Sequence, residues 1–223
     1  MTGDDTSAGG EPSARAGAGV FADGQVYQPA EDSRLLLEAA REGIGAGDRV
    51  LDVGTGSGYV AVEVAAATGA SVVATDVNPH ACRAARERAA AAGVPVAVVR
   101  ADLLAAVCGR FDAVLFNPPY LPDAAPPDAD AAPVPDADDW LSVAVSGGES
   151  GRAVVAPFIE DVGRVLAPGG AVYLLVSSLM DVEAVLDLAD EAELGGESVA
   201  RDSFPFETLS VLRLTRDRDI QKE

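Results

Sequence analysis

Histidine and cysteine are almost absent from this 223-residue chain, and their scarcity excludes several kinds of site. The single histidine, His80, leaves little material for a zinc site or a histidine-based nucleophilic triad. The two cysteines, Cys82 and Cys108, are too few for a disulfide framework and lack metal-ligand spacing. We therefore expect no metal in this chain.

Long apolar runs are missing as well. No uninterrupted apolar stretch approaches the roughly 20 residues of a membrane-spanning helix. Residues 1–20 are rich in Gly, Ala, Ser and Asp and lack the apolar segment of a signal peptide, so we expect a disordered tail there. A short C-terminal tail is expected at 217–223. These features predict a cytoplasmic protein that does not associate with membranes.

Positive charge is scarce, since Lys222 is the only lysine and the formal net charge is −20. Such an acidic surface opposes binding to the phosphate backbone of nucleic acid, which depends on clustered Lys and Arg. Two explanations stay open. One is GC-rich coding, which favours Ala, Gly, Asp and Arg over Lys; the other is adaptation to a salt-rich, halophilic cytoplasm, where screening removes self-repulsion. The second would weaken the argument against nucleic acid.

Apolar segments of strand length alternate with helical segments over the rest of the chain. Strands are predicted at 49–53, 71–75, 94–100, 111–116, 171–177 and 207–214. Helices are predicted at 34–41, from the glycine loop to about 68, at 79–92 and 151–166, and after Met180. The last strand alternates, which predicts one less-buried face. The alternation predicts a parallel α/β sheet covered on both faces, in a single domain over 21–216.

Glycines and aspartates gather at the predicted strand ends. The first strand runs into Asp52-Val53-Gly54-Thr55-Gly56-Ser57-Gly58, whose alternate glycines let a ligand approach the backbone. The G-x-G-x-G spacing differs from the dinucleotide pattern, and Asp52 would repel a pyrophosphate but tolerate the cationic S-adenosylmethionine. Asp76, which ends the second strand, is placed to accept hydrogen bonds from both ribose hydroxyls. Asp102 and Leu103, after the third strand, are placed to bind and cover an adenine.

The segment Phe116-Asn117-Pro118-Pro119-Tyr120 must end the fourth strand, because proline lacks an amide donor. Asn117 is thereby left at the carboxyl end of a strand, where open α/β sheets bind ligands. Its side-chain oxygen and the Pro118 carbonyl can accept the two hydrogens of a planar NH₂ group and aim its nitrogen at a sulfonium methyl. Tyr120 can stack on that group. We therefore assign catalysis to Asn117, Pro118 and Tyr120.

With Val26-Tyr27-Gln28-Pro29-Ala30-Glu31-Asp32-Ser33 and Gly147-Gly148-Glu149-Ser150-Gly151, these motifs resemble the HemK-type protein glutamine methyltransferases, and more closely their archaeal and eukaryotic branch. The resemblance implies a seven-stranded, Rossmann-like class I methyltransferase fold. It implies that the chain uses S-adenosylmethionine to methylate the glutamine of a Gly-Gly-Gln loop in a translation release factor, together with a small zinc-binding activator subunit. The methyl donor is expected to contact Tyr27, Ser33, Asp52, Gly54, Gly56, Gly58, Asp76, Val77, Asp102, Leu103 and Asn117.

Other functions stay open from the residues alone. The Asn-Pro-Pro-Tyr tetrapeptide also occurs in methyltransferases that act on the exocyclic amino groups of adenine (N6) or guanine (N2). A methyltransferase-like subunit that binds a partner without catalysis is the third reading, although an intact Asn117 argues against it. The family also suggests lysine methylation, for which a site that accepts two amide hydrogens is poorly suited. No substrate contact is transferred to 123–139, which is unusually rich in Pro and Asp.

Overall fold

The computed structural model describes residues 25–122 and 140–216. The strands in these ranges are β1 (Arg49–Val53), β2 (Ser71–Asp76), β3 (Val96–Arg100), β4 (Phe111–Phe116), β5 (Leu166–Ser177), β6 (Leu194–Phe204) and β7 (Glu207–Arg216). The helices are α1 (Glu31–Arg41), α2 (Tyr59–Thr68), α3 (Pro79–Ala92), α4 (Trp140–Val145), α5 (Val155–Val162) and α6 (Val182–Glu191), with a 3-10 turn, η1 (Ser178–Met180). The two predicted tails and 123–139 lie outside the described residues.

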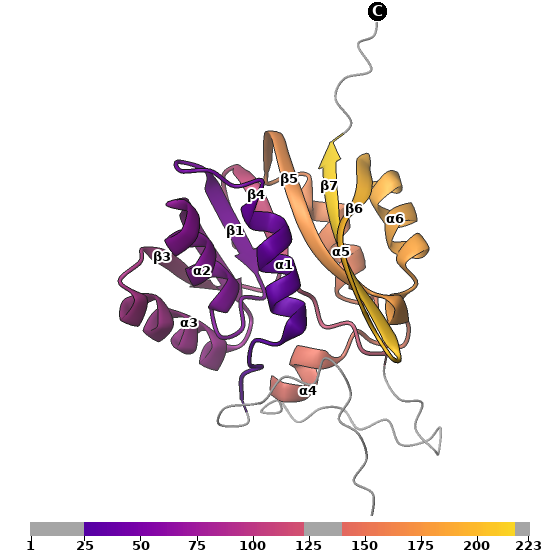
Figure 1. The fold of residues 1–223 in the computed structure, drawn as a ribbon, viewed down its shortest axis with the longest axis horizontal. Coiled ribbons are helices and arrows are strands. Elements are labelled where there is room, and N and C mark those ends of the chain that lie inside the picture. The colour runs from indigo at the N-terminus through magenta and orange to yellow at the C-terminus, as the bar shows by residue number, and fades with distance from the viewer. Residues whose placement is uncertain (1–24, 123–139, 217–223) are drawn as a thin grey trace, which may run out of the picture.

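The seven strands form one sheet in the order β3-β2-β1-β4-β5-β7-β6. Pairing is parallel from β3 to β5, whereas β7 runs antiparallel to both of its neighbours. The seven-stranded, mostly parallel methyltransferase fold is therefore confirmed (Figure 1). Among the described residues, no helix has the length and apolar character needed to cross a membrane.

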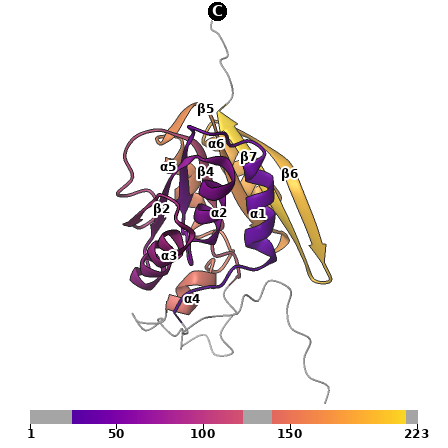
Figure 2. The same cartoon turned by 60° about the vertical axis from the view of Figure 1, so that its left-hand side comes forward.

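Helices cover both faces of the sheet. α1, α2 and α3 lie along one face, and α5 and α6 lie along the other (Figures 1 and 2). Between these layers the strands β1, β4 and β5 are buried almost throughout, as their runs of Val and Leu require for a sheet with two covered faces. The Phe116 ring at the end of β4 meets the Phe158 ring of α5 with 4.5 Å between their centroids. The core thus reaches the residue that precedes Asn117.

Two sequence predictions for the second half of the chain were wrong in detail. The helix expected at 151–166 is shorter, because α5 ends at Val162 and Leu166 already belongs to β5. The turn expected at 168–170 lies within β5 as a bulge: Phe111 pairs with Leu166 and Ala113 with Ala171, which leaves four β5 residues opposite a single β4 residue.

The C-terminal region differs more. β6 was not predicted, and it forms a hairpin with β7 at the edge of the sheet. The expectation of one less-buried face on the last strand was also wrong, since Ser210, Val211 and Leu212 are all buried. The reason is that α1 lies against β7 on one side, and β7 is an inner strand between β5 and β6.

Candidate active site

A cavity of about 1060 Å³ opens at the carboxyl ends of β1, β2 and β4. The strand order reverses between β1 and β4, and ligands of open α/β sheets bind at such a reversal. Segments from elsewhere complete the walls: the chain before α1, the helix α4, and the turn between β6 and β7. Small-molecule sites commonly have roughly 300–1,000 Å³. The cavity therefore has room for a nucleoside cofactor and for part of a second substrate.

The structure brings nearly all predicted site residues to this cavity. Those that line it are Tyr27, Ser33, Asp52, Gly54, Gly56, Asp76, Val77, Asp102, Leu103, Asn117, Pro118 and Tyr120. Gly58 lies outside the described lining. It precedes α2 with a φ of +77°, and a Cβ at this position would lie 2.7 Å from the Ala85 Cα. Gly58 therefore lets α2 pack closely against α3, and its contact with the cofactor stays a prediction.

The glycine loop at 54–58 is fixed to the end of β2 by hydrogen bonds. The Thr55 amide donates to the Thr75 carbonyl at 2.9 Å, and the Gly56 amide donates to Asp76 Oδ2 at 2.8 Å. The other Asp76 oxygen, Oδ1, accepts from the Asn78 amide at 2.8 Å. Burial raises the pKa of Asp76 and these amides lower it. The Val77 amide is a third donor to this carboxylate, which keeps a lone pair for a ligand hydroxyl.

Asp52 is a buried carboxylate at the end of β1, only 3% exposed. Its Oδ2 accepts a hydrogen bond from Thr55 Oγ1 at 2.5 Å. The pKa of Asp52 is raised to about 7. Burial is the largest cause, the hydrogen bond from Thr55 opposes it, and the charge of Asp76 adds to it. An ionised Asp52 is therefore unfavourable unless a cation lies nearby. The sulfonium and ammonium groups of S-adenosylmethionine fit this requirement.

Asn117 lines the cavity and contains a buried acceptor that has no hydrogen-bond partner among the described residues. Its Nδ2 donates to Asp32 Oδ2 at 3.2 Å, whereas its buried Oδ1 has no hydrogen-bond partner among the described residues. This hydrogen bond to Asp32 turns the NH₂ of the Asn117 amide towards Asp32 and the amide oxygen away from it. A buried carbonyl without a donor is costly, so this oxygen calls for a donor from a ligand.

Asp32 is the centre of the network that fixes this amide. It is 2% exposed, and its Oδ1 accepts from the Ser33 amide at 2.6 Å and from Ser33 Oγ at 3.2 Å. Its Oδ2 also accepts from the Tyr27 hydroxyl at 3.3 Å. The motif at 26–33 is therefore connected to the acceptor Asn117 by the hydrogen bonds of one side chain, Asp32.

Tyr120 has a second carboxylate beside it, Glu207 at the start of β7. Glu207 hydrogen-bonds to the Tyr120 hydroxyl and accepts from Ser177 Oγ at 2.7 Å. Burial raises the pKa of Tyr120, and the charges of Asp32 and Glu207 raise it further. Tyr120 thus stays neutral and anchored, with its ring in the cavity wall.

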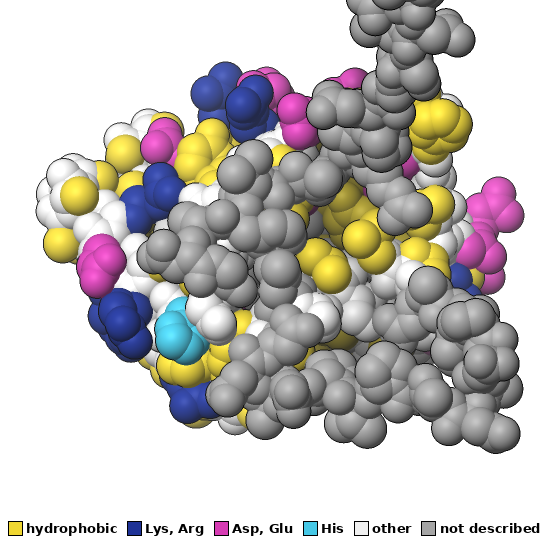
Figure 3. Space-filling view, turned by 90° about the horizontal axis from the view of Figure 1, so that it is seen from below, with side chains coloured by type: hydrophobic (Ala, Val, Ile, Leu, Met, Phe, Trp, Pro, Cys, Tyr) yellow, Lys and Arg dark blue, Asp and Glu magenta, His cyan; other side chains and the backbone are white. Residues whose placement is uncertain are grey.

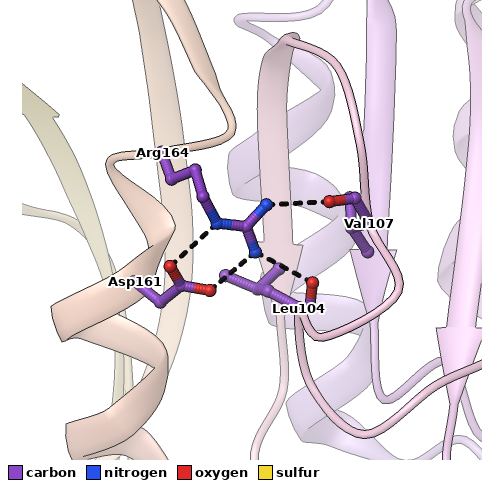
Figure 4. Close-up of polar contacts among 4 residues, drawn as sticks. All are labelled: Leu104, Val107, Asp161 and Arg164. Carbon is purple, nitrogen blue, oxygen red and sulfur yellow. Dashed lines mark hydrogen bonds and ion pairs between the residues drawn. The ribbon is translucent and has the colours of Figure 1, made fainter.

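Arg164, after α5, supports the segment that carries Asp102 and Leu103. Its guanidinium donates to the Leu104 carbonyl at 2.9 Å and the Val107 carbonyl at 2.8 Å, and it makes a two-pronged pair with Asp161 (Figure 4). Leu103 has a φ of +45°, which is strained for a leucine. The hydrogen bonds of Arg164 to Leu104 and Val107 stabilise the segment that follows this turn, while Asp102 and Leu103 line the cavity.

Sequence reasoning did not identify Asp32, Glu207 or Arg164 as parts of the site. Asp32 had a visible signal, since it belongs to the motif at 26–33, but its charge was explained by its place in the first turn of a helix. Glu207 and Arg164 had no such signal in the sequence, because the residues that they contact are far away in the chain. Within the described ranges, no cluster of three or more His, Cys, Asp or Glu side chains could hold a metal.

Comparison with known proteins agrees with this geometry. A model of the methyltransferase small domain family matches residues 13–134. The human methyltransferase HEMK2 is 34% identical over 209 residues, which cover 90% of this chain and 93% of that protein. A Methanocaldococcus jannaschii protein, described provisionally as a protein N5-glutamine methyltransferase, is 34% identical over 86% of this chain and 92% of its own length.

Among solved structures, Mtq2 from the E. cuniculi Mtq2–Trm112 complex superposes with a TM-score of 0.65 and 29% identity, over 86% of this chain and 99% of that one. That complex methylates the translation termination factor eRF1. The two sequence relatives match over nearly their whole lengths, and the structural relative shares the full fold. The chain therefore belongs to the HemK-type N5-glutamine methyltransferases, in the branch of HEMK2 and Mtq2 within the class I S-adenosylmethionine-dependent methyltransferases.

Proposed function

We propose that this chain, as a single methyltransferase domain over 21–216, methylates the side-chain amide nitrogen of the glutamine in a Gly-Gly-Gln loop of a translation release factor. The observation that carries the proposal is the buried, unpaired Oδ1 of Asn117, a residue that lines the cavity and whose Nδ2 is bound by Asp32. The relatives of known activity support the choice of substrate, because Mtq2 acts on a termination factor and several bacterial relatives are release factor glutamine methyltransferases.

The acceptor half of the site would bind the glutamine amide. Asn117 Oδ1 and the Pro118 carbonyl would each accept one N–H, which fixes the plane of the amide and turns its nitrogen towards the donor. Amide nitrogen is a poor nucleophile because its lone pair is delocalised, so these acceptors would act most strongly as positive charge develops on nitrogen. Tyr120 would stack on the amide. The nitrogen becomes acidic as its new bond forms and can release its proton to water.

The donor half of the site would hold S-adenosylmethionine, whose sulfonium supplies an electrophilic methyl group. Asp76 would bind the ribose hydroxyls, and Asp102 and Leu103 the adenine. Tyr27, Ser33, Val77 and the backbone at Gly54 and Gly56 would complete the contacts. Asp52 would face the cationic amino-acid end. We extend the proposal to a heterodimer with a small zinc-binding activator subunit in the cytoplasm, in keeping with the Mtq2–Trm112 complex.

Mass spectrometry of a release factor tests the proposal. The factor is incubated with S-adenosylmethionine, the activator subunit and this chain, and one methyl group is expected on the glutamine of the Gly-Gly-Gln loop. Two controls should abolish it: Asn117→Ala in the enzyme and Gln→Ala in the loop. Methyl transfer that persists after Gln→Ala, or that prefers RNA or DNA over the release factor, would refute the proposed substrate.

A further inference from the structure

Most of the large apolar side chains that the described residues expose gather at the cavity mouth. Of the seven, five line the cavity: Val77, Leu121, Val143, Leu179 and Phe206. The two outside it are Val99 and Val199. Val77 lies beside Asp76 in the donor half of the site. The other four, Leu121, Val143, Leu179 and Phe206, we name the apolar rim. In the view from below, hydrophobic side chains gather on this face (Figure 3).

Phe206 is the most exposed member of the rim, at 89%. It occupies the turn between β6 and β7, immediately before the buried Glu207. The ring is scarcely buried by the described residues, and exposed apolar side chains that cluster beside a cavity mark binding sites. Its position beside the cavity and not elsewhere on the hairpin points to a ligand that also occupies the cavity.

The hairpin side of the rim is fixed to the catalytic segment. Ser177 Oγ donates to Glu207 and accepts from the Leu179 amide at 3.1 Å, while the Thr208 amide donates to Ser178 Oγ at 3.0 Å. Glu207 in turn hydrogen-bonds to Tyr120. The two residues that follow the ring, Glu207 and Thr208, are thereby tied to the end of β5, to η1 and to the residue that follows the acceptor prolines. Phe206 and Leu179 are therefore held at a defined distance from Asn117.

The opposite side of the rim is fixed in the same way. The Leu121 amide donates to the Val145 carbonyl at 3.0 Å, and the Leu121 carbonyl accepts from the Gly147 amide at 2.8 Å. These bonds join the exit of the acceptor segment to the end of α4, which carries Val143. The rim thus consists of two groups of apolar side chains. The segment that carries each group is hydrogen-bonded to residues next to the acceptor Asn117.

The chemistry of the cavity selects its occupant. The described lining contains the carboxylates Asp32, Asp52, Asp76, Asp102 and Glu207, and no Arg or Lys. Such a lining disfavours a phosphodiester chain and permits an uncharged polypeptide. A glutamine side chain spans about 5 Å from Cα to its amide nitrogen. A glutamine whose amide reaches Asn117 therefore keeps its own backbone within about 5 Å of that amide, in the cavity or at its mouth.

We propose that the apolar rim binds the residues that immediately flank the methylated glutamine in the substrate protein, with Phe206 as the principal contact. The proposal rests on the proposed function, because it needs a glutamine in the acceptor half of the site. It assigns to the β6–β7 turn the recognition of the substrate backbone and its neighbours, separate from the recognition of the amide by Asn117.

Steady-state kinetics of Phe206→Ala and Phe206→Leu test this, with the activator subunit present and the release factor as the varied substrate. Phe206→Ala should raise KM by about tenfold, the typical effect of removing one central aromatic contact, with kcat and the Kd of S-adenosylmethionine unchanged. The KM of Phe206→Leu for the release factor should lie between those of wild type and Phe206→Ala. Val199→Ala is the matched control, since Val199 is exposed on the same hairpin, at 41%, but outside the cavity.

The possible failures are distinguishable. If wild-type enzyme methylates the release factor and Phe206→Ala leaves KM unchanged, the docking role of the rim is wrong and the proposed function stands. If wild-type enzyme does not methylate the factor, the proposed function fails and the docking proposal fails with it. Sedimentation that shows a wild-type dimer lost in Phe206→Ala would instead assign the rim to a second copy of the chain. Loss of RNA binding alone in this variant would assign it to nucleic acid, and would equally overturn the proposal.

Discussion

Asp52→Asn separates what the buried carboxylate does for the cofactor from what it costs the fold. Burial raises the pKa of Asp52 to about 7, from an ordinary value of 3.8. A tenfold change in an acid dissociation constant corresponds to about 1.4 kcal/mol, so ionised Asp52 destabilises the ligand-free protein by about 4 kcal/mol at high pH. Asparagine has the same shape and can still accept from Thr55, but it has no charge to desolvate.

The direction of the pH dependence of stability follows from the direction in which folding shifts the pKa of Asp52. Because the folded pKa lies above the unfolded one, Asp52 is more easily ionised in the unfolded chain, and stability falls as pH rises from about 4 through about 7. The asparagine variant lacks this dependence. From the two pKa values, its stability relative to wild type should increase by about 2 kcal/mol between pH 5.5 and pH 8.5.

Urea denaturation of both proteins without cofactor, at pH 5.5 and pH 8.5, measures this difference. Carboxylates that do not interact with Asp52 titrate alike in both proteins and cancel in the comparison. Asp187→Asn, the same chemical change at an exposed position on α6, serves as the matched control. A stability difference between Asp52→Asn and wild type that is the same at both pH values would refute the argument that Asp52 is a desolvated carboxylate.

Three further substitutions test the supports of the site. Asp32→Asn removes the group that dictates the orientation of the Asn117 amide, so kcat should fall by about tenfold or more, a larger change than that in the Kd of S-adenosylmethionine measured by calorimetry. Arg164→Ala frees two carbonyls behind the adenine segment, and the Kd of S-adenosylmethionine should rise severalfold with kcat at saturation unchanged. Gly58→Ala combines a positive φ with a 2.7 Å approach to Ala85, and denaturation should show a loss of about 1–3 kcal/mol.

The first half of the fold was predictable from sequence because its signals are local. Pro79 after Asn78 marks the start of α3, where the Asn78 side chain accepts from the His80 amide as a cap. The glycine loop and the prolines after Asn117 mark where β1 and β4 end. Strand ends in a parallel sheet meet at one edge, so the relative placement of the donor and acceptor halves followed as well.

The contacts that orient the site were not predictable, because they join distant segments. Asp32 and Asn117 are separated by 85 positions, and nothing in either local sequence shows that they meet. β6 was missed because it is an edge strand whose side chains are largely exposed and include Gly195 and Gly196, so it has neither apolar alternation nor a continuous apolar run. Phe206 and Glu207 owe their place at the cavity to that hairpin.

The charge of the cavity has a consequence for turnover. Its described titratable lining is acidic, and Asp52 and Asp76 both lie where burial makes an unpaired negative charge unfavourable. The methyl donor carries a sulfonium charge that the thioether product lacks, so the same carboxylates attract the donor more strongly than the product. The loss of the sulfonium charge thereby favours product release. The ratio of product Kd to donor Kd should fall in Asp52→Asn, and an unchanged ratio by calorimetry would show that this carboxylate responds only to the ammonium group that donor and product share.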